Sequence, residues 1–123
     1  MKKIYTEQAP AAIGPYSQAV ISGNLVFTSG QIAINPASGN VEAEGIEAQT
    51  EQVMKNLGAV LKAAGSSYEK VVKTVCFLKN MEDFSVFNDI YGRYFTEKPA
   101  RSCVAAAALP KGVLVEVEVI AEV

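Results

Sequence analysis

The stretch Val113–Ile120 (VLVEVEVI) decides the fold, because its residues alternate strictly between two classes. Valine occupies positions 113, 115, 117 and 119, whereas Leu114, Glu116, Glu118 and Ile120 stand between them. Successive side chains of a β-strand point to opposite faces of a sheet. The pattern therefore predicts a strand with one apolar face turned to a core and one mixed face that carries two carboxylates.

Two segments upstream have the three- and four-residue apolar spacing of amphipathic helices. The first runs from Glu44 to Ala64, and Gly65 after it suits a left-handed C-terminal cap. The second begins after Asn80, a residue suited to the N-cap, and ends before Pro99. The apolar stripe of this second helix consists of Phe84, Phe87, Tyr91, Tyr94 and Phe95.

The remaining apolar segments are short and predict strands. Val71–Leu78 (VVKTVCFL) is rich in β-branched and aromatic residues, and strand structure resumes over Arg101–Ala107. Near the N-terminus, turn residues separate the pieces 16–21, 25–29 and 31–34, which fit a hairpin or meander. The order of elements predicts an α+β fold, with a mostly antiparallel sheet and two helices packed on one face.

The composition fits a single domain over residues 1–123 and excludes several kinds of chemistry. Half of the residues are apolar, so a chain of this length can bury a core without disulfides or metals. The chain has no histidine, so it cannot build Ser-His-Asp catalysis, Cys-His catalysis or a His-ligated zinc site. Its net charge of −2 gives no basic excess for nucleic acid or an anionic membrane, and we expect neither partner.

The two cysteines, Cys76 and Cys103, form no CxxC motif, so the sequence indicates neither a metal site nor a redox pair. Two thiols in a chain with an adequate core favour a reducing compartment. The N-terminal segment has no apolar run of signal-peptide length, and no segment of the chain reaches the length of a membrane span. We therefore expect a soluble cytoplasmic protein.

Arg101 is the most informative charged residue, because it opens a strand directly after Pro99 among small and apolar residues. A guanidinium in such surroundings needs a partner, and its planar donors fit a carboxylate through two hydrogen bonds. That carboxylate could be Glu116 or Glu118 of a neighbouring strand, or it could belong to a ligand. The spacing of the residues does not decide between a glutamate of the chain and a ligand as the partner of Arg101. The other arginine, Arg93, lies off the apolar stripe of its helix, and we expect it in solvent.

The two glutamates of the last strand also have two interpretations. A charged strand residue most often faces solvent. Glu116 and Glu118 stand between apolar residues, however, and apolar surroundings raise the pKa of a carboxyl group toward that of a useful general base.

Three other features are weaker candidates for chemistry. Lys73 is either an exposed sheet lysine or a desolvated amine able to form a Schiff base. Cys103 alternates onto the Arg101 side of its strand, where it is either a small core thiol or part of a site. The turn at 29–31 (SGQ) could offer backbone N–H groups to an oxyanion.

Motifs along essentially the whole chain resemble those of the reactive intermediate deaminase A (RidA/YjgF) family. The stretch 9–19 (APAAIGPYSQA) is similar to the opening signature of that family. The other motifs follow in the family's order: Ser29-Gly30-Gln31-Ile32, Val72-Lys73-Thr74, Phe87-Asn88-x-x-Tyr91, Pro99-Ala100-Arg101-Ser102, Leu109-Pro110-Lys111-Gly112 and 115–121 (VEVEVIA).

The resemblance implies a chorismate-mutase-like α+β fold, a homotrimer with clefts between subunits, and an enamine/imine deaminase. Such enzymes hydrolyse 2-iminobutanoate and 2-iminopropanoate to 2-oxoacids and ammonia, with no cofactor and no metal. By position, Arg101 matches the arginine that grips the substrate carboxylate, and Glu116 matches the acid that positions the attacking water. The matched substrate-binding residues are Tyr16, which closes the cleft, Ser29, Gly30 and Cys103, which contact the ligand, and Phe87 and Asn88 of the cleft wall.

The chain departs from many relatives at two places. The segment Phe95–Pro99 is shorter, which changes a wall of the implied cleft, and alanines at 105–108 replace an acidic residue and an arginine. Two other functions attributed to relatives remain as alternatives. One is RNA cleavage with inhibition of translation, for which an acidic chain with two arginines is poorly suited. The other is a non-catalytic module that senses a ligand through the same pocket.

Overall fold

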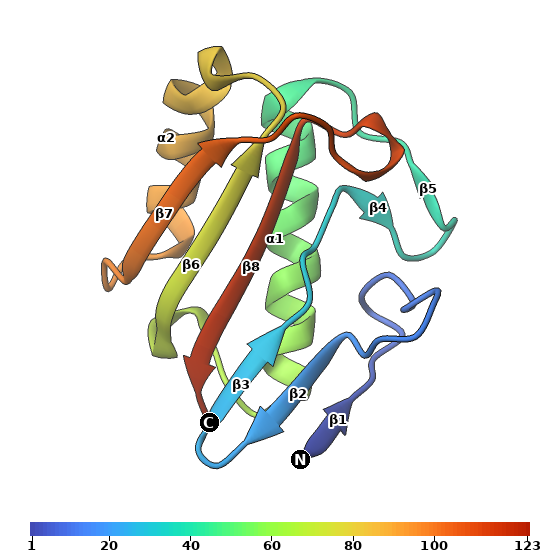
Figure 1. The fold of residues 1–123 in the computed structure, drawn as a ribbon, viewed down its shortest axis with the longest axis vertical. Helices are drawn as coiled ribbons and strands as arrows, with labels where there is room; N and C mark the ends of the chain where they lie inside the picture. The colour runs from blue at the N-terminus through green and yellow to red at the C-terminus, as the bar shows by residue number, and fades with distance from the viewer.

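The last strand, β8 (Val115–Glu122), lies inside the main sheet of the computed structural model, which describes residues 1–123 (Figure 1). Its neighbours β3 (Leu25–Thr28) and β6 (Val71–Leu78) both pair with it in the antiparallel direction. The valines at 115, 117 and 119 are buried, whereas Glu116 and Glu118 between them are half-buried. The alternating pattern thus forms the predicted strand with one face in the core, but the strand begins at Val115 and ends at Glu122, because Val113 ends the 3₁₀ turn before it.

The complete sheet has six strands in the order β1-β2-β3-β8-β6-β7. The strands β1 (Lys2–Ile4) and β2 (Ala19–Ser22) extend it beyond β3, and β7 (Ala100–Ala105) forms the opposite edge. All neighbours are antiparallel except β6 and β7. A separate ribbon pairs β4 (Ile34–Asn35) with β5 (Asn40–Val41). The predicted mostly antiparallel α+β fold is confirmed.

The helices α1 (Gly45–Ala63) and α2 (Phe84–Tyr94) cover the same face of the sheet, as predicted (Figure 1). Gly65 after α1 has a φ of 80°, the left-handed conformation expected of a C-terminal cap. The helix α2 connects the parallel strands β6 and β7, which a tight turn cannot join. No helix combines the length and the apolar character needed to cross a membrane. The core between the layers includes Val53, Met54, Leu57, Leu61, Phe87, Val115 and Val117.

The structure corrects several predicted boundaries at the N-terminal end. The sequence did not indicate β1, because this short strand with two lysines carries no alternating pattern and forms only by pairing with β2. The strand predicted over 16–21 begins at Ala19. The piece predicted over 31–34 supplies one isolated bridge, from Gln31 to Val117, before the short β4.

Two further boundaries differ toward the C-terminal end. Asn80 precedes a 3₁₀ turn over Met81–Asp83 and makes no capping hydrogen bond through its side chain, so it does not cap α2 directly. The strand predicted over 101–107 ends at Ala105 instead, because only residues up to this point pair with β6.

Asn56 anchors the loop after β3 to α1. Its side chain is buried, and Nδ2 donates hydrogen bonds to the carbonyl oxygens of Ile32 at 3.0 Å and Ile34 at 2.9 Å. When a buried carbonyl oxygen loses its hydrogen-bond donor, the folded state is destabilised by the full free energy of removing that oxygen from water. One amide therefore ties this loop, which leads from β3 to β4, to α1.

We expect Asn56→Ala to lower the free energy of unfolding by about 2–4 kcal/mol, because two carbonyl groups lose their donor. Urea denaturation at a fixed protein concentration measures the change. Lys55→Ala, at an exposed position of the same helix, is the control and should change the midpoint little. Equal losses in the two variants would contradict the anchoring role of the amide.

Candidate active site

Four of the residues predicted for the site line one cavity of about 320 Å³. Tyr16 belongs to the loop before β2, Ser29 and Gly30 to the turn after β3, and Glu116 to β8. Glu116 reaches the cavity from the sheet face that the helices leave open. Residues distant in the sequence thus meet where the sheet adjoins the N-terminal loop.

Gly30 allows the Glu116 carboxylate to lie directly against the backbone, because a methyl group at this position would collide with it. The backbone N–H groups of Ser29 and Gln31 donate to carbonyl oxygens at 2.9 Å each. The N–H of Gly30 has no acceptor. The turn therefore offers one free backbone donor beside a carboxylate, which is the kind of donor predicted from the sequence.

The pKa of Glu116 is raised above the ordinary value for a glutamate. Burial is the larger cause, and the negative charge of Glu118 on the same strand face adds to it. Phe77 of β6 pairs with Glu116 in register and contributes to its apolar surroundings. A carboxyl group whose pKa is raised is a stronger base than an ordinary glutamate, which favours a role in proton transfer.

Gln18 organises the wall of this cavity, although sequence reasoning assigned it no role. Its buried side chain accepts a hydrogen bond from the N–H of Thr6 at 2.7 Å. It also donates to the carbonyl oxygens of Thr6 at 3.0 Å and Pro10 at 2.8 Å. The only sequence signal was its place in the stretch 9–19, because the backbone groups that it satisfies are identified only by the folded loop.

Arg101 lies apart from these residues, in a second cavity of about 450 Å³ between α2 and the turn before β7. Its Nη1 donates a hydrogen bond to Oδ1 of Asn88 at 2.7 Å. Its Cζ lies 4.7 Å from the ring centre of Tyr91 and 5.4 Å from that of Phe84. The only ion pairs in the structure involve Arg93, so the guanidinium of Arg101 has no carboxylate partner.

Arg101 and Glu116 lie on opposite faces of the sheet. Arg101 is in register with Thr74, which is buried under the helices, whereas Glu116 is in register with Phe77 on the open face. The strand β6 also separates β7 from β8. The ion pair that the sequence left open is therefore absent, and one chain does not bring the predicted arginine and acid into one cavity.

Cys103 follows Arg101 on the helix side of β7, in register with Cys76 of β6. Both thiols are free. Burial raises the pKa of Cys103 although the charge of Arg101 opposes this, and it raises the pKa of Cys76 to about 12. The thiols therefore stay protonated near neutral pH and are poor nucleophiles. No group of three or more His, Cys, Asp or Glu side chains is arranged to hold a metal ion.

Phe87, predicted at the cleft wall, is fully buried in the core and lines neither cavity. Its ring packs against Tyr91, with centroids 5.7 Å apart. Phe87 lies three residues after Phe84 and one before Asn88, and these two neighbours face Arg101 instead. Its side chain can support the site only through packing.

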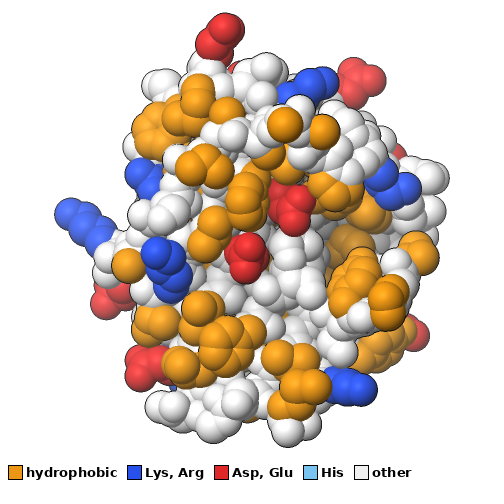
Figure 2. All heavy atoms as spheres, in the orientation of Figure 1, with side chains coloured by type: hydrophobic (Ala, Val, Ile, Leu, Met, Phe, Trp, Pro, Cys, Tyr) orange, Lys and Arg blue, Asp and Glu red, His pale blue; other side chains and the backbone are white.

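The sheet face opposite the helices is largely apolar and uncovered. Figure 2 shows this face, with acidic side chains in its middle among hydrophobic ones. The strand β8 turns Glu116, Glu118 and the exposed Glu122 to this face, and Lys73 lies half-buried on it without an ion pair. The apolar side chains that point outward from β3, β6, β7 and β8 include Phe27, Val75, Phe77, Val104 and Ile120.

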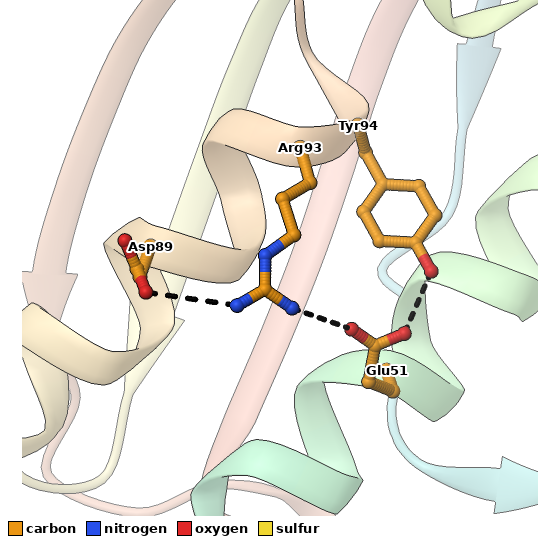
Figure 3. A network of polar contacts seen from close by, with 4 residues as sticks. All are labelled: Glu51, Asp89, Arg93 and Tyr94. Atoms are coloured by element: carbon orange, nitrogen blue, oxygen red, sulfur yellow. Dashed lines mark hydrogen bonds and ion pairs between the residues drawn. The ribbon is translucent and has the colours of Figure 1, made fainter.

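A polar network joins α2 to α1 (Figure 3). Glu51 of α1 accepts a hydrogen bond from the hydroxyl of Tyr94 at 2.7 Å and lies 3.9 Å from Nη1 of Arg93. Arg93 also pairs with Asp89 at 3.6 Å. Its side chain is 64 % exposed, as predicted for a solvated arginine, so the ion pairs themselves stabilise little. The hydrogen bond from Tyr94 to Glu51 links α2 to α1 at the end of α2.

Comparison with known proteins assigns the chain to a family. The family model described as Endoribonuclease L-PSP matches residues 6–123. The protein named "Putative regulator AldR" of Lactococcus lactis is 58% identical over 124 residues, with 100% of this chain and 98% of that protein covered. The 2-iminobutanoate/2-iminopropanoate deaminase of Escherichia coli K12 is 49% identical over 124 residues, with 98% and 96% covered. The chain belongs to the RidA/YjgF family.

The fold of this RidA-family protein also matches solved structures of the family. The crystal structure of E. coli TdcF with bound serine superposes with a TM-score of 0.94 at 41% identity, and covers 100% of this chain and 99% of that one. The family resemblance and the fold predicted from the motifs are therefore confirmed.

The raised pKa of Glu116 gives its stability contribution a definite pH dependence. Ionisation of Glu116 is less favourable in the folded chain than in the unfolded chain. The stabilising contribution of its protonated form is therefore complete below the pKa that Glu116 has in the unfolded chain, and it is lost as pH rises through the pKa that Glu116 has in the folded chain. We expect Glu116→Gln, which cannot ionise, to raise Tm relative to the parent near neutral pH. This difference should shrink below about pH 4, near the ordinary pKa of glutamate.

Thermal unfolding at several pH values, at one protein concentration, measures this difference. Glu122→Gln removes an exposed carboxylate of the same strand and serves as the control. Glu118→Gln should lower the pKa of Glu116, because it removes the neighbouring negative charge. A difference in Tm between Glu116→Gln and the parent that is independent of pH would contradict the assigned shift.

Proposed function

We propose that this RidA-family protein hydrolyses small 2-imino acids, such as 2-iminobutanoate and 2-iminopropanoate, to 2-oxoacids and ammonia. The observation that carries the proposal is Arg101, whose guanidinium is held by a neutral amide and two aromatic rings instead of a carboxylate. Its charge and its remaining N–H donors stay free for the carboxylate of a ligand. The E. coli relative named for these two substrates supports the choice of reaction.

Glu116 is the proposed general base. The substrate reacts as its protonated iminium form. The Glu116 carboxylate takes a proton from water while the water oxygen bonds to the iminium carbon and the C=N π electrons move to nitrogen, which yields a neutral carbinolamine. Glu116 then gives this proton to the amino group, and the C–N bond breaks as ammonia leaves. The Glu116 carboxylate takes the hydroxyl proton as the C=O bond of the 2-oxoacid forms, and this proton then passes to ammonia or to solvent. The free N–H of Gly30 beside Glu116 is suited to orient an oxygen atom during these steps.

The proposed active unit is a homotrimer in which two copies complete each site. Two observations support it. Arg101 and Glu116 of one chain lie on opposite faces of the sheet, so a second copy is needed to bring such a pair together. The open face carries Phe27, Phe77 and Val104 exposed or half-buried, and such a face favours burial against another copy.

Two other functions have support in names alone. The family description names an endoribonuclease, and the L. lactis relative is named as a regulator. A chain with two arginines and a net charge of −2 is a weak binder of a phosphate backbone. Salt-dependent binding or cleavage of RNA would favour the first alternative, and ligand binding without turnover would favour the second.

The proposal predicts different defects for the two central residues. Arg101→Ala should lose about 2–5 kcal/mol of carboxylate binding, and lysine should not restore it because its point charge cannot form two parallel hydrogen bonds. Glu116→Gln should lower turnover by roughly 10²–10⁴-fold while the affinity for 2-oxobutanoate changes little. A threonine dehydratase-coupled assay of 2-oxobutanoate formation measures turnover, and calorimetric titration with 2-oxobutanoate measures affinity.

Arg93→Ala is the matched control, because it removes the only other arginine at an exposed position. Unchanged turnover in Arg101→Ala would overturn the substrate-binding assignment. Full turnover in Glu116→Gln would move the role of base to Glu118 or to unassisted water.

Mixed assemblies test the proposed sharing of sites. Chains with Arg101→Ala and chains with Glu116→Gln are each expected to be inactive alone. When co-expressed in equal amounts they should recover about one quarter of the parental activity, because that share of sites pairs an intact arginine with an intact glutamate. Sedimentation measures the size of the assembly. An active monomer, or no recovery in mixtures shown to contain both chains, would contradict the shared site.

A further inference from the structure

Arg101 is contacted by three residues that occupy one face of α2. Phe84, Asn88 and Tyr91 are spaced four and three residues apart, so they lie above one another on the helix. Asn88 accepts the hydrogen bond from Nη1, and the two rings lie against the guanidinium. The helix therefore holds the arginine through one amide and two aromatic faces.

The ring of Tyr91 is itself fixed from several sides. Its hydroxyl lies 2.8 Å from Oγ1 of Thr74, which is in register with Arg101 on the neighbouring strand. Its ring lies 4.3 Å from that of Phe95 and 5.7 Å from that of Phe87, measured between centroids. The ring under the guanidinium is thus tied to the sheet at one end and packed within the helix layer.

All three contacts are electrically neutral. A carboxylate at the place of the Asn88 amide would hold Arg101 more strongly, but it would cancel the positive charge and occupy donors that an anion needs. An amide oxygen and aromatic rings restrict the side chain without adding a negative charge. No ion pair to Arg101 exists elsewhere in the structure.

We propose that Asn88 and Tyr91 are positioning residues, which fix the Arg101 guanidinium in advance and leave its charge uncompensated for an anionic ligand. Asn88 then acts through Arg101 and not through contact with the substrate. The part of this inference that concerns the ligand rests on the proposed function. The part that concerns Arg101 itself can be measured without any ligand.

The chain offers a direct spectroscopic measurement, because it contains only two arginines. The Nε–Hε signals of Arg93 and Arg101 can be assigned in nitrogen-15 NMR spectra with an Arg93→Lys variant. Tyr91→Leu should remove the part of the ring-current shift of the Arg101 signal that comes from Tyr91 and leave the part that comes from Phe84, whereas Tyr91→Phe should keep both. Tyr94→Phe is the matched control: it removes a hydroxyl from the same helix that bonds Glu51, and it should leave the Arg101 signal in place.

Titration with 2-oxobutanoate measures the consequence for binding. Tyr91→Leu should raise Kd by about 3- to 30-fold, the range expected from loss of a cation–π contact. Asn88→Ala should raise it by about 2- to 10-fold, whereas the isosteric Asn88→Asp should raise it by about 10- to 100-fold because it adds a charge-assisted partner for Arg101. A merely structural role of Asn88 predicts the reverse order, since Asp fills the same volume as Asn.

The outcomes separate the two proposals. An unmoved Arg101 signal in Tyr91→Leu, or an Asn88→Asp protein that binds at least as tightly as Asn88→Ala, would overturn the positioning role. Should Tyr91→Leu fail to fold, the comparison between Asn88→Asp and Asn88→Ala decides the question. A shifted Arg101 signal in a protein whose parent neither binds 2-oxobutanoate nor hydrolyses imines would support the positioning role and overturn the proposed function.

Discussion

Burial of the valine face of β8 beneath α1 and α2 determines where the candidate site residues lie. Because side chains alternate along a strand, turning the valines into the core turns Glu116 and Glu118 to the open face. The same rule places Arg101 under α2, since it is in register with the buried Thr74. A shift of β8 by one residue would exchange its two faces and place the carboxylates in the core.

The surroundings of Glu116 and Arg101 have opposite effects on charge: those of Glu116 disfavour its charged form, and those of Arg101 leave its charge uncompensated. The carboxylate of Glu116 loses water and faces a second negative charge, so its pKa rises and it holds a proton more readily. The guanidinium of Arg101 meets only neutral partners and keeps its charge. The proposed hydrolysis of a small anionic imine uses one proton-transferring acid and one fixed cation. Because the two groups lie on opposite faces of one chain, the proposed site needs a second copy of the chain to bring them together.

Much of the architecture follows from short-range patterns. The strict alternation of 113–120 predicts the central strand, the three- and four-residue spacing predicts α1 and α2, and Gly65 marks the end of α1. The pattern fails where structure depends on a distant partner. The strand β1 exists only because β2 is beside it, and the bridge from Gln31 to β8 has no local signal.

The sequence by itself determined the layered α+β fold, the family, and which residue types are available for chemistry, because alternation, helical spacing and ordered motifs are local properties. Only the tertiary structure decided how these residues are partnered. It joins Tyr16, Gly30 and Glu116 in one cavity, buries Phe87, and gives Arg101 an amide and two rings instead of Glu116. The physical reason is that the face of a strand and the register between strands are set by packing of the whole core, which brings together groups far apart along the chain.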